Sequence, residues 1–216
     1  MSRPLLDQAP GRDPGPGLAG VEANARLTAT TGMLLALLLL TEGWTLLDVR
    51  GYITLHTALG LILIGPVVLK CLTTIYRFGR YYTGAPAYVR KGPPHIILRV
   101  IGPLVVISTI AVIATGIALL VDHGQSGTWL TLHQASFIAW ISVTGIHFLG
   151  HLQGAVVDTG RELRRATRDP AQRGKAVRWV AVAAALLVGV GLAAAFTPAA
   201  SSWQLQHDHR GTIQGR

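Results

Sequence analysis

The chain has 216 residues, of which 50% are hydrophobic and only 13% are charged, and its mean hydropathy is +0.43. This composition excludes an ordinary soluble domain and is typical of a polytopic membrane protein. The net charge of +9 comes from basic residues between apolar stretches, which indicates orientation in a membrane rather than nucleic-acid binding. The single cysteine, Cys71, excludes an intramolecular disulfide, and no C-x-x-C-H motif is present for covalent haem attachment.

Five stretches of the chain have the roughly 20 apolar residues that a membrane-crossing helix requires. In chain order they are 27–47, 53–76, 96–121, 129–152 and 177–197. We therefore predict an all-α integral membrane protein, with a four-helix bundle and a fifth transmembrane helix. The predicted division is a flexible tail at 1–24, the bundle at 25–152, a basic linker at 153–176, the fifth helix at 177–197 and a second tail at 198–216.

Basic residues gather in two of the four connections between these stretches. The sequence has Arg77, Arg80, Arg90 and Lys91 before the third stretch, and seven Arg or Lys residues between Arg161 and Arg178 before the fifth. The positive-inside rule predicts that both connections are cytoplasmic, so the N-terminus is cytoplasmic and the C-terminus external. The same orientation places Trp44 in an outer interfacial belt and Trp179 in an inner one.

Histidines inside the apolar stretches are the main functional signal. His56 lies near the start of the second stretch and His133 near the start of the fourth. Both stretches run from outside to inside, so the two imidazoles share a membrane depth. Two facing imidazoles can bind a haem iron between two helices, and Gly60 would let a flat macrocycle approach the backbone. The alternative interpretation is a pair of histidines that only hydrogen-bond between helices.

The fourth stretch also carries His147 and His151. His147 follows His133 by 14 residues, which corresponds to about 21 Å of helical rise and about 40° of rotation. The two side chains therefore share a face at opposite depths, a spacing that excludes a common metal ion and suits two haems. His151 is either the inner ligand itself, a partner of a haem propionate, or an interfacial histidine.

This pattern resembles the bacterial four-helix membrane cytochromes b, the integral subunits of nickel–iron hydrogenases and formate dehydrogenases. The resemblance covers the first four stretches and rests on His56, His133 and His147. It implies a haem-binding bundle in the bacterial plasma membrane with one or two haems b per chain. The implied partners are membrane lipid, a quinone or quinol, and an extracytoplasmic oxidoreductase subunit of the molybdenum-containing kind.

The chain departs from that family in its first stretch, which contains no histidine to complete an inner haem site. Three substitutes remain open: His95 at the start of the third stretch, Lys70 at 14 residues after His56, or a five-coordinate iron. His95 is the preferred one. Lys70 has the alternative role of extending to the headgroups or pairing with a propionate.

The resemblance implies electron transfer by a subunit of an oxidoreductase rather than a self-contained enzyme. In agreement, the sequence has no nucleophile–base pair and no phosphate-binding loop. Glu42, near the outer end of the first stretch, is interpreted as a carboxyl group that hydrogen-bonds a neighbouring helix, with proton uptake from a quinol as the alternative. Two rival functions are a transition-metal transporter, for which the ligands are few, and a cofactor-free membrane scaffold.

Overall fold

The structure, a computed structural model, describes residues 18–91, 96–163 and 174–214, and these ranges are helical apart from short connections. Five long helices follow one another: α1 (Leu18–Thr45), α2 (Ile53–Tyr82), α4 (Ile96–Val121), α5 (Gly127–Leu163) and α6 (Lys175–Gln214). A 3-10 turn, η1 (Leu46–Asp48), and a short helix, α3 (Pro86–Lys91), complete the described elements. The all-α prediction is confirmed.

Each of the five long helices contains a segment long and apolar enough to cross a membrane. These segments are Ala19–Asp48, Ile53–Tyr82, Val100–Val121, Gly127–Gly160 and Lys175–Pro198. Large apolar side chains cover their outer surfaces; Leu40, Val121 and Leu187, for example, are more than two-thirds exposed. Such a surface is unfavourable in water and suits hydrocarbon, so the chain is a multi-pass membrane protein.

The helices extend beyond the limits that hydropathy predicts. α1 begins at Leu18, inside the segment expected to be a tail, and α5 continues to Leu163, inside the expected linker. α6 passes through Pro198 and ends at Gln214, where a second tail was expected. Hydropathy locates the part of a helix that lies in lipid, but backbone hydrogen bonding continues as long as the residues outside it tolerate a helix.

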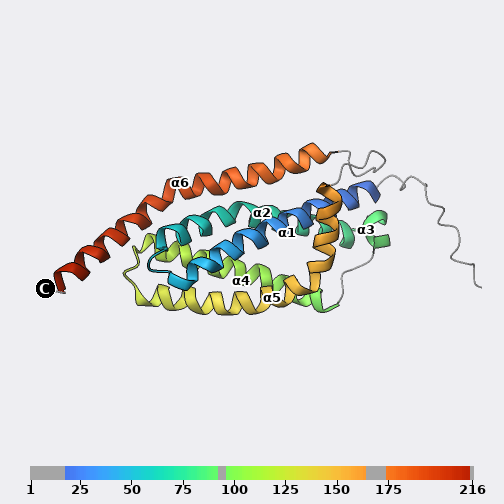
Figure 1. The fold of residues 1–216 in the computed structure, drawn as a ribbon. Coiled ribbons are helices and arrows are strands. Elements are labelled where there is room, and N and C mark those ends of the chain that lie inside the picture. Colours follow the sequence, from blue (N-terminus) through green and yellow to red (C-terminus); the bar gives the residue numbers. More distant parts are fainter. Residues whose placement is uncertain (1–17, 92–95, 164–173, 215–216) are drawn as a thin grey trace, which may run out of the picture.

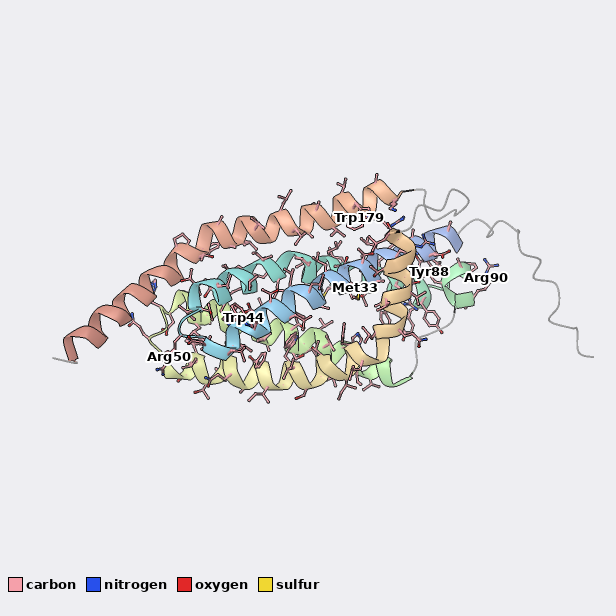
Figure 2. All side chains as sticks on the ribbon, viewed as in Figure 1. Met33, Trp44, Arg50, Tyr88, Arg90 and Trp179 are labelled. Atoms are coloured by element: carbon pink, nitrogen blue, oxygen red, sulfur yellow. The ribbon has the colours of Figure 1, made fainter. Side chains whose placement is uncertain are left out.

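Helices α1, α2, α4 and α5 form a bundle, and α6 lies outside it against α2 (Figure 1). Within the bundle α1 packs on both α2 and α5, α4 packs on α5, and α2 touches α4 only sparsely. The short connections at 46–52 and 122–126 lie at the same end, which we call the connection end. Figure 2 shows Arg50 at this end and Tyr88 and Arg90 at the opposite end.

The contact between α2 and α6 depends on two glycines. A Cβ atom added to Gly65 would overlap the carbonyl oxygen of Ala185, and one added to Gly189 would overlap the carbonyl oxygen of Ile62. The two backbones therefore approach as closely as small residues allow, which is a common way for helices to associate in lipid. Pro66, next to Gly65, is buried at the same crossing.

Gly65→Ala is therefore expected to weaken the docking of α6. Because the obstacle is backbone and not a flexible side chain, the extra methyl should destabilise the protein in detergent by about 1–3 kcal/mol. Gly79→Ala is the matched control on the same helix, since nothing lies within 4 Å of its added Cβ. Thermal unfolding of the two variants checks this prediction, and equal melting temperatures would contradict it.

At the opposite end of the bundle, an ion pair joins α5 to α6. The last part of α5, orange in Figure 1, turns away from the bundle axis and reaches the start of α6. There the Arg178 Nε and Nη2 atoms donate to Glu162 Oε1 and Oε2 at 2.9 and 2.7 Å. Both side chains are buried, at 8% and 2% exposure. This two-pronged pair fixes the bent end of α5 against α6.

Candidate functional site

The ring of His56 is held by two residues from the end of α1. His56 lies in the first turn of α2, and its Nδ1 atom is 2.9 Å from Glu42 Oε1 and 3.0 Å from Thr45 Oγ1. The Thr45 hydroxyl donates its single proton to the backbone carbonyl oxygen of Glu42 at 2.6 Å. Because the Thr45 proton is directed to a backbone carbonyl and a carboxylate oxygen accepts, Nδ1 is assigned as the donor of both contacts, which leaves Nε2 free of them.

His133 is held in the same way from a different helix. Its Nδ1 atom is 3.2 Å from Thr115 Oγ1 on α4, and that hydroxyl donates to the Ala111 carbonyl at 2.8 Å. The nearby Ser136 hydroxyl donates to the His133 carbonyl at 2.9 Å. The two hydroxyls also lie 3.1 Å from each other. Assigning both hydroxyl protons to backbone carbonyls makes Nδ1 of His133 the donor and leaves Nε2 as its other ring nitrogen.

The two rings face each other across the bundle. Their centres are 6.3 Å apart, at an interplanar angle of 78°, although α2 and α5 are not close neighbours along their backbones. The depth match expected from the sequence is present at this position. A metal ion bound by two imidazoles at about 2 Å from each nitrogen places the ring centres roughly 6 Å apart, so the observed spacing fits one ion between them.

Two glycines border this pair of rings. An added Cβ on Gly60 would lie 3.7 Å from Glu42 Oε1, and one on Gly116 of α4 would lie 3.1 Å from His133 Cε1. Gly60 therefore faces the Glu42 carboxylate that contacts His56. Gly116 was not predicted, and its missing side chain leaves room for the His133 ring.

The residues predicted for an inner site lie on two helices, and Lys70 of α2 is close enough to His147 and His151 of α5 to interact with both electrostatically. His147 contacts His151 of its own helix, with ring centres 4.7 Å apart, and the Lys70 ammonium donates to the Thr28 carbonyl of α1 at 2.6 Å. His147 Nδ1 is buried without a hydrogen-bond partner in the described part of the chain. His95, the preferred inner ligand, lies outside the described residues.

Sequence reasoning missed the two threonines that contact the imidazoles, namely Thr45 and Thr115. A signal for Thr115 exists: it precedes the end of α4 at Val121 by six residues, and His133 follows the start of α5 at Gly127 by six. The two are therefore at one depth in an antiparallel pair. Thr45 carries no comparable signal, because only the η1 turn brings it back to His56.

The donor set of the site is two imidazoles that lie opposite each other. No group of three or more His, Cys, Asp and Glu side chains suited to a metal ion occurs within residues 18–91, 96–163 and 174–214. Two opposed imidazoles suit an iron that already has four equatorial ligands, as it does in haem. Comparisons with protein-family models, curated proteins and solved structures gave no match to this chain.

Proposed function

We propose that this protein is a membrane cytochrome of b type that binds haem between His56 and His133. The observation that carries this proposal is the pair of rings 6.3 Å apart, each contacted at Nδ1 by a residue of another helix. In the proposed site Nε2 of each ring would be the ligand atom. When bound, haem iron supplies a one-electron ferric–ferrous couple. The resemblance to four-helix membrane cytochromes b supports the same assignment.

The residues around the rings would hold the cofactor and tune it. Glu42 and Thr45 contact His56 at Nδ1, and Thr115 contacts His133 at Nδ1, so these residues would orient the two imidazoles toward a metal. Apolar residues of α2, α4 and α6, including Leu61, Leu120 and Ala193, form a buried cluster at the same end of the bundle. A dry surround of this kind influences a reduction potential directly.

The proposed electron transfer is between a quinone pool in the membrane and an oxidoreductase outside it, such as a molybdenum-containing one. The resemblance supplies these partner classes, and the basic residues around Arg77 and Arg80 support the orientation with the connection end external. The proposed location is the bacterial plasma membrane. A second haem near His147 stays a prediction of the resemblance.

Reduction by a quinol tests the electron-transfer role. Purified protein in detergent, kept free of oxygen, is expected to develop the visible spectrum of reduced haem b when a soluble quinol is added. Dithionite serves as the control, because it reduces haem without a quinol site. Reduction by dithionite but not by quinols of different potential would show a cytochrome with a different electron donor, and the quinone partner would be wrong.

A further inference from the structure

Glu42 is an acidic side chain placed inside the apolar bundle with one strong contact. Its carboxylate and the His56 ring are only 15% and 20% exposed, and their 2.9 Å contact joins α1 to α2 across the η1 turn. The second oxygen, Oε2, is buried and has no hydrogen-bond partner among the described residues. The hydrogen bond to the His56 ring is therefore the main polar contact that this carboxyl group makes among the described residues.

The two facing histidines consequently have unequal partners. His56 donates from Nδ1 to a carboxylate, whereas the contact of His133 Nδ1 is with the neutral Thr115 hydroxyl. A carboxylate on the far nitrogen raises the basicity of a ligating imidazole and strengthens its electron donation to a metal. In a medium of low dielectric constant the charge itself also acts on a nearby iron over a distance of several ångströms.

From this asymmetry we infer that Glu42 is a positioning residue that acts through His56 to favour the ferric state of the bound haem and so lowers its reduction potential. The inference rests on the proposed function, since it needs a haem ligated by His56. It adds a role for Glu42 that differs from proton uptake. In this role the Glu42 carboxylate accepts the hydrogen bond from His56 Nδ1 and holds that ring in place.

The test is a redox titration of the purified haem-containing protein, comparing the natural chain with Glu42→Gln and Glu42→Asp. Removing the charge in Glu42→Gln is expected to raise the midpoint potential, changing the ratio of ferric to ferrous haem at a fixed potential by tenfold or more, or about 59 mV for one electron. Glu42→Asp keeps a carboxyl group, so its midpoint potential should differ from that of the natural chain by only a small fraction of that shift.

Asp48→Asn is the matched control, because it removes a negative charge from the same hairpin while Asn can still accept the hydrogen bond from the Gly51 amide. Its potential should equal that of the natural chain. Haem loss in Glu42→Gln with retention in Glu42→Asp also supports the inference. Haem retained in both Glu42 variants at equal potentials would overturn it and leave the cytochrome intact, whereas a natural chain without haem would overturn the proposed function itself.

Discussion

Replacing either His56 or His133 with alanine should remove the same haem from the protein. Each imidazole supplies one of the two axial nitrogens in the proposed site, so the loss of either leaves an iron with a single protein ligand. The loss of binding should exceed the roughly 10–100-fold effect that is typical when only an outer-shell partner is removed. The measurement is the haem content of each purified variant, normalised to protein.

His147→Ala is the control for that pair, since it changes the same residue type on the same helix as His133 and lies 14 residues away. The haem between His56 and His133 should be unaffected in this variant. If His56→Ala and His133→Ala changed different spectral components, the two residues would belong to different haems. Full haem retention in either variant would equally contradict the shared site.

A large loss of stability is expected when the buried ion pair between α5 and α6 is broken. Glu162→Gln removes the carboxylate that accepts from Arg178 at 2.7 and 2.9 Å and leaves the guanidinium buried beside a neutral side chain. Breaking a buried pair from one side costs about 3–5 kcal/mol. Thermal or chemical unfolding in detergent should report a loss of this size, because α6 loses its attachment to α5.

The double variant Glu162→Met with Arg178→Leu provides the comparison. Replacing both members of a buried pair with apolar groups of similar volume is often neutral or stabilising, so the double variant should recover most of the lost stability. A single variant as stable as the natural chain would show that the pair makes no net contribution. A double variant less stable than Glu162→Gln would show that the hydrogen-bond geometry of the natural Glu162–Arg178 pair matters more than the balance of charge.

The membrane-spanning part of the fold could be predicted because lipid imposes a simple requirement on composition and length. Each apolar stretch must be about 20 residues long and helical, so the five spans follow from hydropathy. Hydropathy does not determine where each helix ends, because outside the membrane both helical and irregular backbone can form hydrogen bonds with water. The continuation of α5 to Leu163 depends on tertiary contacts such as the one between Glu162 and Arg178.

The proximity of His56 and His133 could be predicted because both residues begin spans that run in the same direction. The side chains that orient them could not be predicted with the same ease. Glu42 and Thr45 reach His56 only through the geometry of the η1 turn, and Thr115 reaches His133 only because α4 packs on α5. Likewise, the role of Gly189 depends on its contact with Ile62, and no local pattern specifies that partner.

The most direct test of the cytochrome proposal is a pyridine haemochrome assay on the natural chain, purified in detergent after expression with adequate haem supply. The proposal predicts at least one haem b per chain, and a second haem would extend it to a site near His147. Protein that is folded and contains no haem would contradict the central claim, because the paired imidazoles of His56 and His133 would then serve only to hold helices together.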